Sequence, residues 1–109
     1  MMNISYDDFA KLDLRVAKII STQPIEGKSR IIQGQVDLGN DDVRDVIIGG
    51  AQYYSHDDLI GKIVIVIANL EPKKMAGVES NAMLLAADVD DKPFWLTVDG
   101  EVPLGSPIK

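Results

Sequence analysis

The sequence contains no cysteine and only one histidine among its 109 residues. Without cysteine, the chain can form no disulfide, no thiolate metal site and no cysteine nucleophile. A single histidine also cannot supply a histidine-rich metal site within one chain. We therefore expect no metal and no other cofactor, and the lack of cysteine suits a reducing compartment.

The sequence also lacks the patterns that mark common enzyme families. It has no P-loop, no glycine pattern of a dinucleotide site and no histidine placed beside a nucleophile. The acidic pairs Asp57-Asp58 and Asp90-Asp91 are explained by helix capping and by a turn, because adjacent side chains point apart. His56 lies in a helix start among these capping acids. We expect no enzymatic activity.

No hydrophobic run is long enough to cross a bilayer, and the N-terminus lacks the basic start and apolar run of a signal peptide. We therefore expect a soluble, cytoplasmic protein with no membrane contact. A length of 109 residues, 46% of them hydrophobic, predicts one domain with a modest core. The formal net charge of -6 argues against non-specific coating of nucleic acid, so any such role must depend on clustered basic residues.

The chain is organised around residues 61–87, which predict two apolar strands joined by a basic loop. The first run, IVIVIA at 63–68, is β-branched at nearly every position and predicts a strand buried on both faces. The second run, AMLLAA at 82–87, is interpreted as a strand, although it would equally suit a turn of buried helix. The loop between them is expected to display Lys73 and Lys74 at the rim of a sheet.

Three further strands are predicted upstream, over residues 13–20, 31–38 and 43–48. In the first of these strands, the alternation places three apolar residues on one face: Leu14, Val16 and Ile20. Arg15 and Ala17 fall on the other face. In the second strand, Gly34 occupies an inward position where a barrel must bend.

Two short helices are predicted where a serine precedes an aspartate by three residues, as in a capping box. The first helix begins at Ser5 and ends near Leu12. The second begins at Ser55, and Gly61 terminates it.

After an acidic turn, residues 94–98 predict a strand, and Asp99-Gly100 is a strong hairpin signal. Many short strands with one or two short helices fit the OB-fold, an all-β five-stranded barrel. We therefore expect this barrel, with short capping helices and a C-terminal β-hairpin extension. The single domain of residues 1–109 would comprise a barrel over about 1–87 and an extension over about 88–109.

The residues that could contact nucleic acid are basic, polar or flexible side chains placed near the predicted turns. Lysine and arginine can pair with phosphates, serine and asparagine can bind sugar or base edges, and an exposed methionine can pack on a base. The candidates are Lys28, Arg30, Arg44, Lys73, Lys74, Ser80, Asn81 and Met83. By composition alone, loop lysines are usually solvated, and Met83 is explained equally well as a core side chain.

Four segments carry more specific motifs: FAKLDLRV at 9–16, VDLG at 36–39, YY at 53–54, and VIANLEPKK at 66–74 followed by GVES at 77–80. These motifs resemble the tRNA-binding domain of methionyl-tRNA synthetases, found at their C-terminus or as a separate β subunit, and of stand-alone tRNA-binding proteins. The resemblance implies an OB-fold that binds tRNA by shape and backbone, usually as a homodimer with the C-terminal extension in the interface. It also implies RNA-facing roles for Lys28, Arg30, Lys73, Lys74, Ser80 and Met83.

The chain departs from the family pattern at Ala17, where glycine is common, and at Asn81-Ala82, where Gln-Gly is usual. Asn81 keeps the amide with a shorter reach, and Ala82 adds a methyl group where the backbone could approach RNA. We predict a tRNA-binding accessory module, with an aminoacyl-tRNA synthetase as a further partner and no chemistry of its own. The alternative is a peptide-binding, chaperone-like or protein-assembly module, because a branch of the same fold resembles a secretion chaperone.

Overall fold

The structure is a computed structural model, which describes residues 2–109. Within these residues the chain forms two short helices, α1 (Tyr6–Ala10) and α2 (His56–Leu59), and nine strands. The strands are β1 (Leu14–Pro24), β2 (Ile31–Asp37), β3 (Val43–Gly49), β4 (Ile63–Ile67), β5 (Lys73–Met75), β6 (Val78–Ser80), β7 (Met83–Leu84), β8 (Ala86–Val89) and β9 (Lys92–Trp95). Neither helix is long and apolar enough to cross a membrane.

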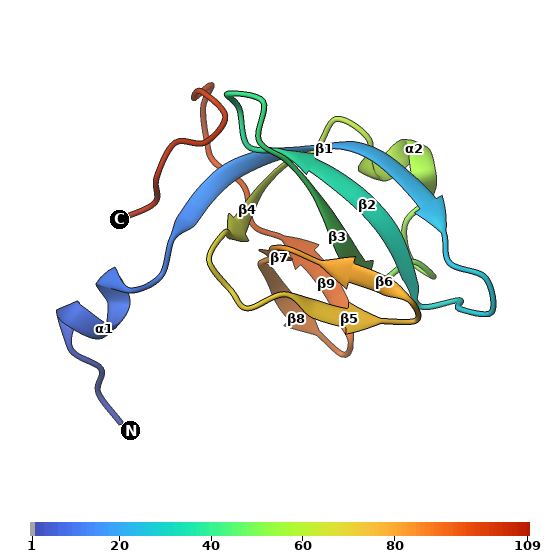
Figure 1. Ribbon diagram of the computed structural model, residues 1–109, viewed down its shortest axis with the longest axis horizontal. Coiled ribbons are helices and arrows are strands. Elements are labelled where there is room, and N and C mark those ends of the chain that lie inside the picture. The colour runs from blue at the N-terminus through green and yellow to red at the C-terminus, as the bar shows by residue number, and fades with distance from the viewer. Residues whose placement is uncertain (1) are drawn as a thin grey trace.

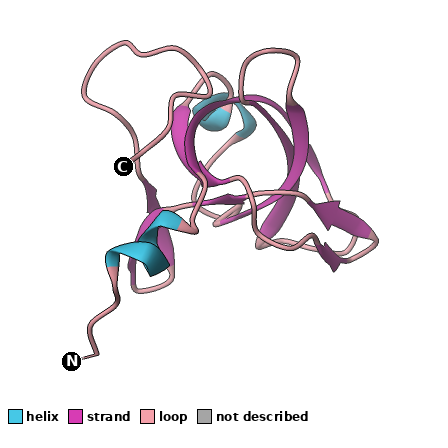
Figure 2. Ribbon diagram, turned by 60° about the vertical axis from the view of Figure 1, so that its left-hand side comes forward, coloured by secondary structure: helices cyan, strands magenta, loops and turns pink. Residues whose placement is uncertain are grey.

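Five strands form one antiparallel sheet in the order β3-β2-β1-β4-β7. The long strand β1 makes this possible, because its first half pairs with β4 and its second half pairs with β2. Figure 1 shows β1 curving across the whole molecule, and Figure 2 shows the strands curled into a ring. The predicted all-β, OB-type barrel with tiny helices is confirmed.

The barrel encloses a core of aliphatic side chains. In β4, Val64 and Val66 are fully buried and Ile65 is nearly so, which confirms the prediction of a strand covered on both faces. Gly34 of β2 is buried at the predicted bend, where an added Cβ would lie 2.5 Å from Cδ1 of Ile48. Glycine at this position therefore leaves the interior space that the Ile48 side chain fills.

Both faces of β1 bury side chains, and the sequence pattern did not predict which face lines the barrel. Ala17 and Ile19 belong to the barrel core, whereas Ile20 is exposed. Val16 is buried outside that core cluster, where the C-terminal segment pairs with β1. The face that carries the small Ala17 is thus the one that lines the barrel.

The central stretch is more broken than predicted. The expected loop at 69–80 forms the β5–β6 hairpin, whose turn residues Ala76 and Gly77 both have positive φ angles of 52° and 80°. This is the geometry of the tight two-residue turns that fit the twist of paired strands. The run at 82–87 is not one strand, since β7 pairs with β4 while β8 pairs with β9. Leu85 lies between them and still donates a backbone hydrogen bond to Ile65 at 2.9 Å.

The C-terminal hairpin is present, but its turn lies earlier than predicted. Strands β8 and β9 are joined by Asp90 and Asp91, which have φ angles of 51° and 69°. The predicted turn at Asp99-Gly100 lies in a bend outside the paired strands, so its prediction as a hairpin is wrong. Aspartate tolerates this left-handed region better than most residues, which explains how the earlier turn forms without glycine.

Beyond β9, the chain returns to the free edge of β1. Gly105 N donates to Val16 O at 2.7 Å, Val16 N donates to Ser106 O at 3.0 Å, and Ile108 N donates to Leu14 O at 2.8 Å. These bonds satisfy backbone groups of β1 on the side opposite β4. The C-terminal residues therefore complete the sheet at this end of the barrel.

The two helices differ in how they are held. In α2, Ser55 and Asp58 form the complete predicted capping box, and the hydrogen bond from the Ser55 backbone lowers the pKa of Asp58. His56 lies in the first turn of α2 and contacts the Thr22 hydroxyl. In α1, Ser5 accepts a bond from Asp8 N at 3.0 Å, but no residue of this helix is buried and it projects from the barrel in Figure 1.

Candidate nucleic-acid interface

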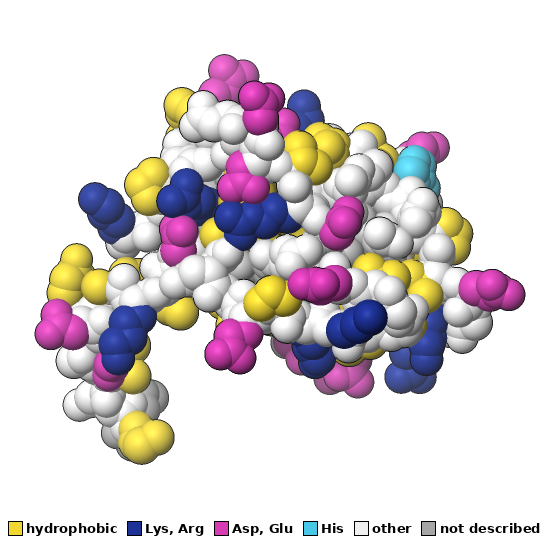
Figure 3. All heavy atoms as spheres, viewed as in Figure 1, with side chains coloured by type: hydrophobic (Ala, Val, Ile, Leu, Met, Phe, Trp, Pro, Cys, Tyr) yellow, Lys and Arg dark blue, Asp and Glu magenta, His cyan; other side chains and the backbone are white. Residues whose placement is uncertain are grey.

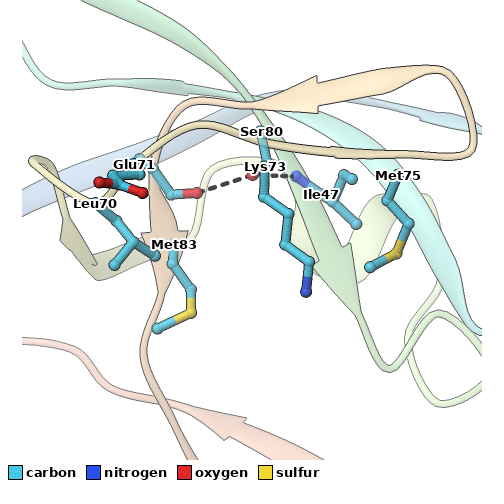
Figure 4. A pocket seen from close by; sticks show the side chains of 8 residues that line it. Ile47, Leu70, Glu71, Lys73, Met75, Ser80 and Met83 are labelled. Carbon is cyan, nitrogen blue, oxygen red and sulfur yellow. Dashed lines mark hydrogen bonds between the residues drawn. The ribbon is translucent and has the colours of Figure 1, made fainter.

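A shallow groove lies between the β5–β6 hairpin and strands β3 and β7. It has a volume of about 170 Å³ and is lined by Ile47, Leu70, Glu71, Lys73, Met75, Ser80, Ala82 and Met83. Figure 4 shows Met75 and Met83 on opposite sides of the groove, with Lys73 between them. The groove therefore combines apolar, flexible walls with the ammonium group of Lys73 and the carboxylate of Glu71. The methionine side chains can hold a flat apolar group, and Lys73 can contact an anion beside it.

The two neighbouring lysines of β5 do not act together. Adjacent residues of a strand point to opposite faces, and Lys73 lines the groove whereas Lys74 is not among its lining residues. Lys74 instead lies directly opposite Glu79 in the register of the hairpin. Lys73 is therefore the only lysine or arginine among the residues that line the groove.

Arg44 is held by four hydrogen bonds inside the fold. Its Nε and Nη2 atoms donate to the two carboxylate oxygens of Asp42, each at 3.0 Å. Its Nη1 atom donates to the backbone oxygens of Ala68 and, at 3.3 Å, of Asn81. Arg44 thereby ties β3 to the end of β4 and to the segment before β7, and its hydrogen bond lowers the pKa of Asp42. These bonds give the side chain a structural role, and its contact with RNA stays a prediction.

Ser80 and Asn81 also close the barrel. The Ser80 hydroxyl accepts a hydrogen bond from Ile47 N at 3.0 Å and donates one to Ala82 O at 2.9 Å. Asn81 N donates to Asp45 O at 2.9 Å. Ala82 is buried and belongs to the core cluster, and it also lines the groove, so its methyl group lies at the inner wall of the groove. Within residues 2–109 the amide side chain of Asn81 makes no hydrogen bond.

Lys28 and Arg30 lie in the loop between β1 and β2, and both are exposed. Neither forms an ion pair with another described residue. In Figure 3, Lys and Arg side chains lie in two areas, at the lower right around the β5–β6 hairpin and at the upper left, with acidic side chains beside both. The predicted set is therefore divided: Lys73, Ser80 and Met83 share the groove, Lys28 and Arg30 share a loop, Lys74 faces away, and Arg44 is part of the fold.

The sequence patterns did not single out four residues of the groove: Ile47, Leu70, Glu71 and Met75. Met75 was detectable in principle, because it follows Lys73 by two residues and shares its face once the segment is recognised as a strand. Ile47 and Leu70 come from other elements, which only the tertiary structure brings together. The described residues contain no group of three or more His, Asp or Glu side chains that could hold a metal ion.

Residues 14–107, most of the chain, match the family described as "Putative tRNA binding domain". The chain belongs to this family. As a tRNA-binding domain it is 46% identical over 108 residues to a methionine–tRNA ligase of Clostridium tetani and 49% identical over 109 residues to that of Thermococcus kodakarensis. These alignments cover 97% and 100% of this chain but only 17% and 15% of those relatives. The chain thus spans less than a fifth of the length of these two relatives.

Solved structures share the fold of this tRNA-binding domain. The crystal structure of a MetRS-related protein from Pyrococcus horikoshii superposes with a TM-score of 0.91 and 34% identity, covering all of both chains. The CsaA chaperone protein from Picrophilus torridus superposes with a TM-score of 0.88 and 29% identity, covering 98% of this chain and 100% of that one. The resemblance predicted from the sequence motifs is confirmed, and the fold occurs in both synthetase-related and chaperone proteins.

Proposed function

We propose that this domain is a cytoplasmic, non-catalytic module that binds tRNA for a methionyl-tRNA synthetase, as a β subunit or a stand-alone homologue. The observation that carries the proposal is the groove in which Lys73 lies between Met75 and Met83, within the segment matched to the family. Lys73 would contact a phosphate while the two thioethers pack against a sugar or base. Binding tRNA beside the synthetase would raise the local concentration of its substrate.

The charge distribution limits how strong this binding can be. The chain has a net charge of -6. Its candidate cations for phosphate contact are Lys73, Lys28 and Arg30, because Lys74 faces away from the groove, opposite Glu79 in the hairpin register. Each phosphate contact contributes about 0.9 to the slope of log affinity against log salt on a duplex. We therefore expect a slope of about 3 per protomer, with affinity that falls steeply above physiological salt.

The test is a fluorescence-anisotropy titration of tRNA at salt concentrations from about 50 to 200 mM. Lys73→Gln is expected to reduce affinity about eightfold at about 0.1 M salt and to lower the salt slope by about 1, because one phosphate contact is lost. Lys74→Gln is the matched control, since it removes the same charge from the adjacent position on the opposite face. The control should have a smaller effect.

Two results would contradict the proposal. The first is a wild-type domain that binds no tRNA even at low salt. The second is equal loss of binding for the variants of Lys73 and Lys74, which would mean that the groove makes no specific contact.

A second function has support from the same groove. The groove walls are mostly apolar, as are grooves that bind the side chains of extended peptides, and they are formed by Ile47, Leu70, Met75 and Met83. A CsaA chaperone protein also shares the fold. If unfolded peptides displace tRNA from the groove, or bind where tRNA does not, the domain is a peptide-binding module. Co-purification of a synthetase without RNA would instead indicate an assembly role.

We also infer that the domain forms a homodimer through the end that carries α1. This five-residue helix buries none of its residues, and the side chain of Tyr6 is 77% exposed. So short a helix is not stable in isolation. A hollow of about 220 Å³ separates it from the C-terminal residues, with Phe9, Leu12 and Ile108 among its lining. A second copy that covers this hollow, which polar and apolar side chains line alike, would use the C-terminal extension, as the sequence resemblance implies.

The dimer is tested by sedimentation equilibrium. Replacing the exposed Ile4 by aspartate is expected to shift the domain from dimer to monomer at micromolar concentration, because a charge would be buried without a partner. Val43→Asp, an exposed apolar position on β3, should leave the dimer intact. A wild-type domain that sediments as a monomer would refute the inference.

A further inference from the structure

Most of the aromatic side chains gather at one place outside the groove. The chain has three tyrosines, two phenylalanines and one tryptophan, and four of these rings surround or adjoin Lys92: Tyr53, Tyr54, Phe94 and Trp95. The Lys92 ammonium lies 5.0 Å from the ring centre of Phe94 and 5.7 Å from those of Tyr53 and Tyr54. These distances are within the range of cation–π attraction.

Two of the four rings hold the fold together. The Tyr54 hydroxyl donates a hydrogen bond to Pro93 O at 2.5 Å, and the Tyr54 and Trp95 rings lie 6.1 Å apart against the core. Gly50 packs closely on the same hairpin, since an added Cβ would lie 2.5 Å from Cγ of Pro93. The loop before α2 and the β8–β9 hairpin are thus fixed against each other.

The other two rings face solvent on this rigid base. Tyr53 is 44% exposed and Phe94 is 46% exposed, although rings of this size are normally buried where they serve only to stabilise a fold. The Phe94 ring keeps this exposure although the Lys92 ammonium lies over it. The backbone of Arg30 lies beside the loop that carries Tyr53, because Ala51 N donates to Arg30 O at 3.1 Å.

We propose that Tyr53 and Phe94 form a stacking site for an unpaired nucleotide of RNA, with Lys92 contacting its phosphate. Exposed aromatic faces beside a lysine or arginine are the arrangement on which splayed-out bases stack. The site rests on the proposed tRNA-binding function and deepens it, because it would add recognition of single-stranded positions to the backbone contacts of the groove. It is built from α2-proximal and β9 residues, none of which lines the groove.

The experiment measures the binding of a fluorescently labelled six-nucleotide single-stranded RNA of adenosines. Phe94→Leu keeps an apolar side chain but removes the ring, and it is expected to weaken binding about tenfold, as loss of one stacked base does. Tyr53→Phe keeps the ring and should bind as the wild type does. Lys92→Met keeps the apolar stem and should lower the salt slope by roughly 0.7, the single-strand value for one phosphate contact.

If Phe94→Leu does not fold, as judged by circular dichroism, the same binding measurement is made with Tyr53→Leu, which removes a ring from a loop. Unchanged binding by the ring-deleted variant would overturn the proposal. A change in sedimentation on ring removal would place these rings in a seam between copies, and selective loss of peptide binding would assign them to a protein ligand. Either result also overturns it.

Titrations with folded tRNA and with the Lys73→Gln variant distinguish a failure of the stacking site from a failure of the proposed tRNA-binding function. A domain that binds tRNA through Lys73 but is indifferent to ring removal refutes only the stacking site. A domain that binds the oligonucleotide through its rings but does not bind folded tRNA refutes only the proposed function.

Discussion

Replacing Arg44 by methionine is expected to lower the free energy of unfolding by about 3 kcal/mol, because hydrogen bonds to charged groups contribute about 1.5 to 3 kcal/mol. The substitution removes the donors to Asp42 and to the backbone oxygens of Ala68 and Asn81 while keeping an unbranched side chain. The barrel would lose its tie between β3, β4 and the segment before β7. A domain of this size should melt roughly 10 to 20 °C lower.

The matched control is Arg15→Met. Arg15 also pairs with an aspartate two residues away, with Nε 2.8 Å from the Asp13 carboxylate, but its side chain is 42% exposed and it has no further hydrogen bond within residues 2–109. An exposed pair of this kind contributes about 0 to 1 kcal/mol. Urea unfolding of both variants measures the difference, and equal destabilisation would mean that the bonds of Arg44 to the two backbone oxygens do not matter.

Replacing Gly105 by alanine is expected to destabilise the domain by at least about 3 kcal/mol, because strain and overpacking each cost about 1 to 3 kcal/mol. Gly105 has a φ angle of 85°, and an added Cβ would lie 2.3 Å from the backbone oxygen of Leu38. A backbone oxygen cannot move aside as a side chain can. The C-terminal segment would have to leave the edge of β1, where Gly105 N donates to Val16 O.

Alanine variants of two other glycines distinguish backbone strain from steric overlap as causes of this destabilisation. Gly77 has a φ angle of 80° but open space around its Cβ position, so its alanine variant should cost only about 1 to 2 kcal/mol. Gly100 has open space and no positive φ, and its alanine variant should be nearly neutral. Thermal unfolding of the three variants should rank them in that order, and a neutral Gly105 variant would refute the proposed close contact.

The fold was predictable from the sequence wherever local patterns and tertiary packing agree. The β-branched run of β4 and the serine caps of both helices are such places, since burial and hydrogen bonding follow from residue type alone. The C-terminal turn was misplaced because Asp-Gly is the stronger local signal, whereas the turn at Asp90-Asp91 is fixed by the pairing of β8 with β9 and by the packing of Trp95 on the core. Long-range contacts outweigh the turn preference there.

The candidate site was less predictable because its members depend on partners far away in the sequence. The oxygens that bind Arg44 belong to residues 24 and 37 positions later, and no local pattern distinguishes such an arginine from a free one. The separation of Lys73 from Lys74 required knowing that the segment is a strand. The stacking site around Lys92 is a proposal. The roles toward RNA remain predictions for all eight candidates: Lys28, Arg30, Arg44, Lys73, Lys74, Ser80, Asn81 and Met83.

The pairing of residues 105–108 with the start of β1 has a consequence for how the domain is made. Arg15 and Pro107 form a bridge across almost the entire chain length, so this closure has a high contact order and is expected among the slow steps of folding. A growing polypeptide on the ribosome would present the start of β1 with one side unsatisfied until residues 105–108 emerge. During that interval the open edge is the place where two nascent chains could pair wrongly, and loss of residues 105–108 by proteolysis would make this hazard permanent.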